Sequence, residues 1–433
     1  MALKEPGPAE GRDTVTPSSG QAKLKTAFAL GVVNGIIFNF AYAFVDPNTV
    51  LPVFVSELTP SKVAVGLISM LAVGGWMVPQ LLAANVLQAR PRDMPIYQAG
   101  AAVRALCWPA AALTVYFIGA TRRDTTLLAF LFFYAVFTCA GGVAGVAFMG
   151  VVGKTVPPRR LGRFFGMRQM GGGALAVVAG LIVREMLRDG TDFPGNYVWL
   201  FVIASVLFAI AWLSFALIPE PQQRDPRPRT PLGPFLAQAA SIVKTDADFR
   251  GLLVARLLMG ASGLAAPFYA VYCRAELGAP RQMLGSYISA QMLGSIISNA
   301  FWAPLSDRYS NTLLLKVAAA ATVLTTGLGA AVAIGDRPGA NSMFLLVFFL
   351  LGVINAGGFM GGTNYLLEVA PERQRPTYVG AMNTFAAASA VFPVFAGKAI
   401  ELIGYPPVFA MAAVCAVFAC IAVARLRELR QPA

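Results

Sequence analysis

The sequence contains no histidine, which excludes a histidine-based metal site, an imidazole general base and an imidazole proton relay. Charged residues are also scarce: they make up 13% of the 433 residues, whereas a soluble globular chain has about 25%. Hydrophobic residues account for 57%. This composition excludes a soluble enzyme with a single membrane anchor, and it predicts a chain that lies in the lipid bilayer over most of its length.

Cysteines are few, and no two of them have Cys-x-x-Cys spacing. The five are Cys107, Cys139, Cys273, Cys415 and Cys420. Each lies in an apolar stretch, which indicates small core residues and neither a disulfide framework nor a zinc site. A phosphate-binding loop is lacking as well, because Phe148 stands where the first glycine is needed before Gly153-Lys154-Thr155. We therefore expect no metal, no cofactor and no enzymatic activity.

The charges that are present divide the chain into apolar windows. Twelve windows carry at most one charge each and are about as long as a membrane-spanning helix. They cover residues 26–56, 63–89, 94–121, 125–153, 164–183, 193–219, 251–273, 282–306, 317–335, 338–367, 376–397 and 402–424. Their Ala, Gly, Leu, Val and Phe content favours closely packed helices over the alternating strands of a membrane barrel.

Most of the 34 lysines and arginines fall in the tails and between alternate pairs of windows. This bias is typical of the cytoplasmic loops of membrane proteins, and it predicts that both termini lie in the cytoplasm. The formal net charge of +13 therefore has a simpler cause than a nucleic-acid partner. We expect an integral protein of a bacterial cytoplasmic membrane, surrounded by lipid and without nucleic acid.

A long polar stretch separates the sixth and seventh windows. The predicted units are a disordered cytoplasmic tail, a first bundle, a cytoplasmic linker, a second bundle and a short tail, over residues 1–22, 23–218, 219–246, 247–425 and 426–433. An internal repeat supports this division, because residues 156–166 and 370–380 share Pro, Arg, an aromatic residue and Gly at equal spacing. Each segment follows the fourth window of its half, which predicts two parallel six-helix repeats.

Residues 303–315, after the eighth window, read Ala-Pro-Leu-Ser-Asp-Arg-Tyr-Ser-Asn-Thr-Leu-Leu-Leu. This segment resembles the loop signature of the major facilitator superfamily, G-x-L-x-D-R-x-G-R-[KR]-x-x-[LIM], and the matching residues are Leu305, Asp307, Arg308 and Leu315. In the corresponding loop of the first half, Ala89 stands in place of the acid. With the twelve windows, the linker and the repeat, the layout resembles this family over residues 24–425.

The resemblance implies an all-α membrane protein with twelve transmembrane helices in two pseudo-symmetric six-helix bundles. It also implies secondary transport of a small solute by alternating access, in which the bundles rock about a central site. We expect a monomer coupled to protons, as a symporter or an antiporter. Facilitated transport without a coupling ion, translocation of a lipid or amphiphile, and a non-transporting assembly or sensor role are the alternatives.

Charges inside a window are candidates for function, because a charge at the bilayer centre costs at least about 2.5 kcal/mol without a partner or a water-filled cavity. Asp46 is an acid well inside the first window, and Asn39 and Tyr42 precede it on the same helix face. The resemblance makes this a cavity helix, so we expect the stripe to face substrate, with Asp46 as the ion or proton site. Alternatively, Asp46 reaches water near the helix end and caps a break at Pro47.

Arg256 lies in the seventh window, which the resemblance also places at the cavity. Gly260 and Gly263 leave space beside its guanidinium group, and we expect that group to bind an anionic part of the substrate. The alternative is an arginine that extends to the cytoplasmic surface or pairs structurally. Arg104 lies in the third window, outside the implied cavity, so a structural role inside the bundle is favoured there.

Three uncharged polar residues complete the candidate substrate site: Gln291 in the eighth window, and Asn355 and Tyr365 in the tenth. Their side chains are costly in lipid, so they should face protein or the cavity. Contact between helices is an equally good interpretation of each.

The resemblance implies a lock on the cytoplasmic side in the outward-facing state. Asp307 is expected at the N-terminus of the fifth spanning helix, where the helix dipole favours a negative charge, and Arg308 is expected to pair with Glu368. In the first half, Lys154 stands at the repeat position of Glu368 and is expected to repel Arg90. The predicted lock is therefore one-sided. The alternative is a set of solvated loop charges, each worth well under ~1 kcal/mol.

Overall fold

The computed structural model describes residues 17–87, 89–188, 192–222, 231–335, 339–371 and 374–429. The helices of the first half are α1 (Pro17–Ala43), α2 (Val50–Leu58), α3 (Lys62–Met70), α4 (Trp76–Leu87), α5 (Met94–Ile118), α6 (Arg123–Thr155), α7 (Leu161–Met186) and α8 (Gly195–Ala216). Those of the second half are α10 (Ala247–Ser262), α11 (Ala266–Ala275), α12 (Met283–Arg308), α13 (Asn311–Gly335), α14 (Ala340–Val369), α15 (Arg375–Ala386), α16 (Phe392–Ile403) and α17 (Tyr405–Ala424).

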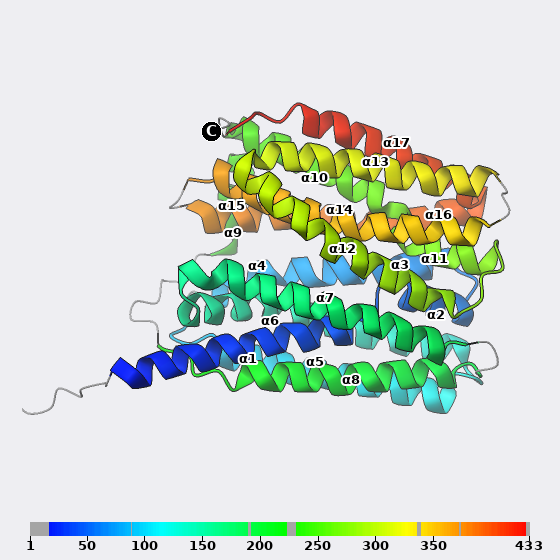
Figure 1. Cartoon of the computed structure of the whole chain (residues 1–433), viewed down its shortest axis with the longest axis horizontal. Coiled ribbons are helices and arrows are strands. Elements are labelled where there is room, and N and C mark those ends of the chain that lie inside the picture. The colour runs from blue at the N-terminus through cyan, green and yellow to red at the C-terminus, as the bar shows by residue number, and fades with distance from the viewer. Residues whose placement is uncertain are drawn as a thin grey trace, which may run out of the picture.

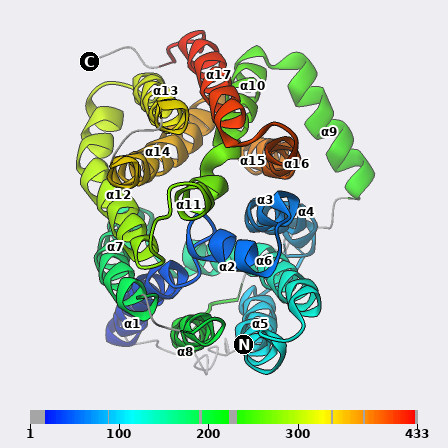
Figure 2. The same cartoon turned by 90° about the vertical axis from the view of Figure 1, so that its right-hand side faces the viewer.

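The helices run side by side along one direction, with the first half below and the second half above in Figure 1. α1 begins and α17 ends on the left, which we call the near end, whereas α2, α11 and α16 lie at the opposite, far end. Figure 2, which looks onto the far end, shows each half as its own bundle of helices. The predicted all-α, two-bundle fold is confirmed.

Eleven helical segments of the described residues are long and apolar enough to cross a membrane. The window that is not among them is α12, although its 26 residues are ample for a span. Gln291, Ser295 and Asn299 lower the hydropathy of α12. Because α12 packs against both α7 and α14, its polar side chains have neighbours other than lipid.

Four of the helical spans are interrupted. α1 and α2 are separated by residues 44–49, which contain Pro47, and α10 and α11 are separated by a 3₁₀ turn, η3 (Gly263–Ala265), just before Pro267. Proline lacks the N–H that continues a helix, so both breaks have a local cause. The other two interruptions, η1 (Leu71–Gly75) between α3 and α4 and η5 (Ala387–Val391) between α15 and α16, contact each other across the halves.

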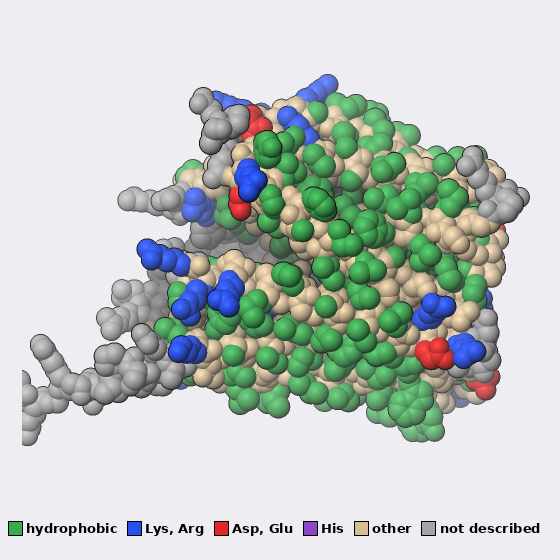
Figure 3. Space-filling model, in the orientation of Figure 1, with side chains coloured by type: hydrophobic (Ala, Val, Ile, Leu, Met, Phe, Trp, Pro, Cys, Tyr) green, Lys and Arg blue, Asp and Glu red, His purple; other side chains and the backbone are tan. Residues whose placement is uncertain are grey.

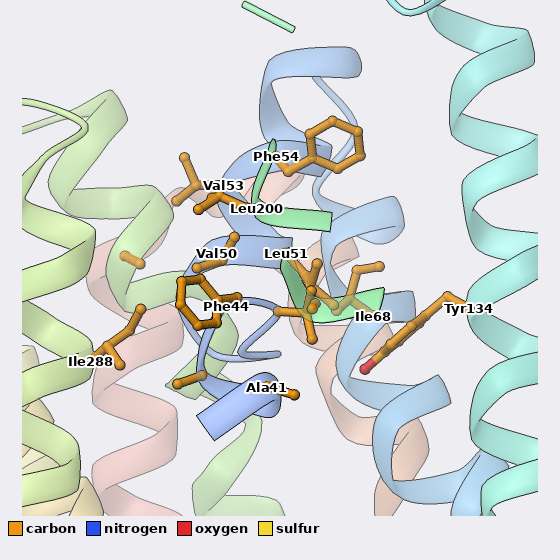
Figure 4. Packing of buried hydrophobic residues seen from close by; sticks show 14 of the residues in the cluster. Ala41, Phe44, Val50, Leu51, Val53, Phe54, Ile68, Tyr134, Leu200 and Ile288 are labelled. Atoms are coloured by element: carbon orange, nitrogen blue, oxygen red, sulfur yellow. The ribbon is translucent and has the colours of Figure 1, made fainter. Parts of the chain in front are cut away.

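The break in the first span is followed by a short helix that is buried on most sides. Val50, Leu51 and Phe54 of α2 are fully buried. The Phe54 ring lies 5.0 Å from the Phe130 ring and 5.1 Å from the Tyr197 ring, measured between centroids. Figure 4 shows α2 side chains packed with others of this core. Aromatic packing of this kind fixes the position of the segment that carries Asp46.

The two halves meet backbone to backbone at the far end. Gly66 of α3 faces the carbonyl of Pro393, Gly397 of α16 faces the carbonyl of Lys62, and Gly180 of α7 faces that of Gly285 in α12. A Cβ atom at any of these three glycines would overlap the facing backbone, so glycine is what permits the contact.

The near end is different. A Cβ atom at Gly162 or Gly166, in the first turns of α7, would have no atom within 4 Å. Figure 3 shows the surface hollowed between the two halves on this side. The halves are therefore closed at the far end and separated at the near end.

Two predicted boundaries need correction. α1 begins at Pro17, so it includes the end of the predicted 1–22 tail, whose first 16 residues lie outside the described residues. The predicted linker contains a helix, α9 (Leu232–Thr245). Residues 223–230 of the linker lie outside the described residues. Ala239 and Ile242 of α9 are buried, and α9 contacts α10 and α15.

Replacement of Gly352 by alanine is expected to lower the thermal unfolding midpoint in detergent. A Cβ atom there would overlap the backbone carbonyl of Gln291, and overpacking of this kind costs about 1–3 kcal/mol. The matched control is Gly327→Ala, at a helical glycine with no atom near the added Cβ; it should leave the midpoint unchanged or raise it, since alanine favours helix. Equal midpoints for the two variants would contradict the close packing of α12 on α14.

Candidate functional site

A cavity of about 530 Å³ lies between the two halves, which is within the range of about 300–1,000 Å³ that is usual for ligand sites. α1, η1 and α4 line it from the first half, and α10, α11, α14 and η5 line it from the second. Its polar lining residues are Tyr42, Asn48, Ser69, Arg256, Ser262, Tyr269, Thr322, Thr326, Asn355 and Ser389. Tyr42, Arg256 and Asn355 are candidates that the sequence already indicated.

Arg256 is the charged residue of this cavity. It lies on α10 beside Gly362 of α14, where an added Cβ would be 3.8 Å from the Arg256 Cζ atom. No described residue accepts a hydrogen bond from its guanidinium group or forms an ion pair with it, and the described lining of the cavity includes no Asp or Glu. The cavity therefore offers a cation whose donors have no protein partner, which suits an anionic ligand group.

Asp46 lies directly behind the cavity wall. It is 2% exposed, and its Oδ1 atom accepts hydrogen bonds of 2.9 Å from the Asn48 amide and from the Thr49 hydroxyl. Asn48 and Pro47 line the cavity. The carboxylate thus caps the turn between α1 and α2, but it does so in a buried position and not at a water-exposed helix end.

The predicted stripe on α1 does not face the cavity as a unit. Tyr42 lines the cavity, whereas Asn39 donates hydrogen bonds to the Gly35 carbonyl at 3.0 Å and to Gln169 Oε1 of α7 at 3.1 Å. Asn39 therefore connects α1 to α7. The helical period placed Asn39 and Tyr42 on one side of α1, but only the packing of α7 decides which part of that side is covered.

Gln291 and Tyr365 lie outside the cavity lining. Gln291 is 6% exposed, on the side of α12 that packs against Gly352. Tyr365 is fully buried, and its hydroxyl donates to the Arg427 carbonyl at 3.1 Å. Tyr365 thus ties α14 to the segment after α17, which is the alternative that its sequence position left open. The Oε1 atom of Gln291 is buried without a hydrogen-bond partner among the described residues. Asn355, by contrast, is exposed on α14 and lines the cavity.

Two further arginines of the apolar windows are held inside the first half. The guanidinium carbon of Arg104 lies 4.4 Å from the Phe137 ring centroid and 4.7 Å from that of Trp212. Arg168 of α7 donates to the Gly31 carbonyl and, at 3.0 Å, to Asn34 Oδ1 of α1. Aromatic faces and carbonyl oxygens thus stabilise these charges, which leaves Arg256 as the intramembrane arginine that lines the cavity.

The predicted near-end lock is open in this structure. Asp307 and Arg308 are exposed at the end of α12, and Arg90 is exposed as well. Glu368 accepts a hydrogen bond of 2.8 Å from Asn311 Nδ2. While the near end is open, Glu368 is therefore hydrogen-bonded to Asn311. Because Asn311 is part of the 303–315 motif, its position in the sequence could have suggested this contact.

Lys154 has partners that the sequence did not reveal. Its ammonium group lies 2.7 Å from Asp93 Oδ2 and 2.8 Å from Glu220 Oε1. Glu220 also accepts from the backbone amides of Asp93 and Met94, at 2.9 and 2.8 Å, and so caps the start of α5. Two carboxylates therefore neutralise Lys154, and the predicted repulsion of Arg90 is wrong.

Two charged contacts close the far end, and neither was expected. Arg281 forms a two-pronged pair with Glu57, with N–O distances of 2.9 and 3.0 Å. Glu401 of α16 accepts from the Ser61 hydroxyl at 3.0 Å and the Lys62 amide at 2.9 Å, which caps the start of α3. Each contact joins one half to the other, so both must break if the far end opens.

Comparisons with known proteins agree with this geometry. The family model of the Major Facilitator Superfamily matches residues 251–433. No curated protein matches the chain in sequence. Among solved structures, the nucleoside transporter NupG is similar over 93% of this chain and 100% of its own, with 13% identity and a TM-score of 0.69.

A bacterial homologue of the iron transporter ferroportin is similar in two states. Its inward-facing structure covers 94% of this chain and 98% of its own, with 12% identity and a TM-score of 0.70. Its outward-facing structure covers 92% and 98%, with 15% identity and a TM-score of 0.60. The family model thus matches the second half of the chain, and the solved transporters share the fold of the described chain.

Proposed function

We propose that the protein is a secondary transporter that carries a small organic anion across the membrane by alternating access, with Asp46 as its proton site. The observation that carries the proposal is Arg256, which lines a cavity between the halves and has no partner among the described residues. The cavity favours transport over an assembly or sensor role, because a non-transporting member would have no need for an open central site. We also propose that the monomer is the working unit.

The anionic character of the solute follows from the cost of an unpaired charge. A guanidinium group taken from water loses hydration that only hydrogen-bonded or charged partners replace. Arg168 has such partners in the protein, and Arg104 lies against aromatic rings. Arg256 has neither among the described residues, and it lines the cavity, where water or a ligand can supply a partner. A carboxylate matches its planar pair of donors, so binding of an anion stabilises the site and binding of a cation does not.

Proton coupling is proposed for Asp46 because of its position. No described lysine or arginine forms an ion pair with it, and the hydrogen bonds from the Asn48 amide and the Thr49 hydroxyl both go to its Oδ1 atom. Oδ2 is therefore the atom at which we expect a proton to bind. Since Asn48 lies between the carboxylate and the cavity, protonation of Asp46 can alter the turn that forms part of the cavity wall.

The near end is proposed to be cytoplasmic, so that the structure is open to the cell interior. Lysine and arginine side chains gather toward this end in Figure 3, as the cytoplasmic sides of membrane proteins require. The higher TM-score with the inward-facing ferroportin homologue is consistent with this state. Cavity access would then alternate between the present near-end opening and a far-end opening that breaks the Glu57–Arg281 and Glu401–Ser61 contacts.

Arg256→Lys is expected to weaken binding of the transported anion at least about tenfold, since an ammonium group cannot reproduce the two parallel hydrogen bonds of the guanidinium group. Arg256→Ala should weaken binding further. Arg92→Ala, at an exposed arginine outside the cavity, is the control and should bind as the wild type does. Calorimetry on purified protein measures the affinities, and equal affinity in all four proteins would give Arg256 a purely structural role.

Asp46→Asn is expected to abolish uphill accumulation driven by a pH gradient, while exchange of solute across the membrane continues. The amide keeps the acceptor for Asn48 and Thr49 but cannot take up a proton. Asp124→Asn, at an exposed acid at the start of α6, should transport normally. Both rates are measured in reconstituted vesicles; undiminished accumulation by the Asp46 variant would show that the protein works as a facilitator or uses another proton site.

Charges at the two ends are expected to shift the conformational equilibrium in opposite directions. Glu57→Ala removes a contact that holds the far end closed and should increase the far-open population. Asp307→Asn removes the contact that is expected to hold the near end closed in the far-open state, so it should increase the near-open population. Arg90→Ala should have little effect, and Glu185→Ala, at a mostly exposed glutamate, serves as the control. Distances between spin labels across each mouth report the populations. A shift of the same sign from Glu57→Ala and Asp307→Asn would refute this scheme.

A further inference from the structure

The cavity wall contains an aromatic surface that no protein group covers. Phe359 of α14 lines the cavity, and its side chain is 68% exposed. A phenylalanine ring gains free energy when apolar surface covers it. Inside a ligand cavity, an uncovered ring is therefore a place where an apolar part of the ligand binds.

The ring lies close to the cation of the same cavity. Phe359 and Gly362 are three residues apart on α14, which places them on one helix face, and Gly362 adjoins the Arg256 guanidinium group. Asn355, exposed on the same face, is one turn beyond Phe359. A cation, an aromatic surface and an amide thus follow one another along about 10 Å of helix.

Two methionines also line the cavity that contains this strip. Met259 of α10 lies against Gly358, where an added Cβ would be 3.5 Å from the methionine methyl group. Met77 of α4 lines the cavity from the first half. Methionine side chains pack against flat rings with favourable sulfur contacts, so they can cover the face of a ligand that Phe359 does not.

We propose that the solute is a flat, preferably aromatic, carboxylate. Its carboxylate binds Arg256, its ring stacks on Phe359, and a polar group at the opposite end of the ring reaches Asn355. Phe359 is then the residue that selects for ring-shaped anions. This inference rests on the proposed function, because it describes the ring of the anion whose carboxylate binds Arg256.

The length of the strip limits the size of the solute. A ring that stacks on Phe359 while its carboxylate reaches Arg256 needs only the spacing of one helical turn, about 5 Å. Acetate, which has no ring, can satisfy Arg256 but leaves Phe359 uncovered. A neutral alcohol with the same ring covers Phe359 but leaves Arg256 without an anion. Contact with Arg256 alone or with Phe359 alone should therefore not give full affinity.

The test measures binding of four probes by calorimetry: benzoate, cyclohexanecarboxylate, acetate and benzyl alcohol. In the wild type, benzoate is expected to bind at least tenfold more tightly than each of the other three. Phe359→Ala should remove that preference and leave acetate binding unchanged, whereas Phe359→Tyr, which keeps the ring, should retain it. Phe395→Ala, which removes a ring that is 67% exposed outside the cavity, is the matched control.

The outcomes separate this inference from the proposed function. If Arg256→Lys weakens every anion but Phe359→Ala changes none of the affinities, the solute is an anion without a stacked ring, and the inference is wrong. If benzyl alcohol binds as well as benzoate, or no anion binds, the proposed anion transport is wrong as well. Thermal unfolding of each variant shows whether it is folded. If Phe359→Ala is unfolded, the test uses the probe affinities of Phe359→Tyr instead.

Discussion

Backbone contact between the two halves at the far end is the constraint on which the rest of the structure depends. Where Gly66 and Gly397 face backbone carbonyls of the other half, the helices approach more closely than any side chain would allow. The pairs of Glu57 and Glu401 surround this contact and satisfy polar groups that would otherwise be left at the bilayer surface. Because the halves touch there, they diverge toward the near end, and the cavity is the space between them.

The neighbours of each charged side chain then distinguish structural residues from candidate functional ones. Arg104 lies against aromatic faces, Arg168 is held by carbonyl and amide oxygens, and Lys154 is neutralised by two carboxylates. Each of these charged groups is enclosed by the first half, although the Nε atom of Arg104 has no hydrogen-bond partner among the described residues. Arg256 instead lines the space between the halves, and no described residue forms an ion pair with it. The distinction is energetic, since an unsatisfied cation in this position gains most from an anion that arrives with the ligand.

The candidate site was only partly predictable. The sequence identified Tyr42, Arg256 and Asn355, because a polar or charged side chain in an apolar window must avoid lipid. It also included Asn39 and Tyr365, which meet the same requirement by hydrogen bonds to neighbouring segments, and Gln291, which is buried on α12 outside the cavity lining. Phe359 was missed, because an apolar residue in an apolar window carries no signal until the neighbouring helices are known to leave it uncovered.

The sequence by itself determined the spans, the two repeated halves and the family resemblance, because bilayer thickness and the cost of charge in lipid act on each segment separately. Its motifs placed Asp307 and Arg308 in a loop, but they did not show that Asn311 holds Glu368 while the near end is open. Only the tertiary structure decided which end is closed, which arginine lines the cavity and which aromatic ring is exposed in it. These depend on contacts between helices far apart in the chain, and residue periodicity within one helix does not specify its neighbours.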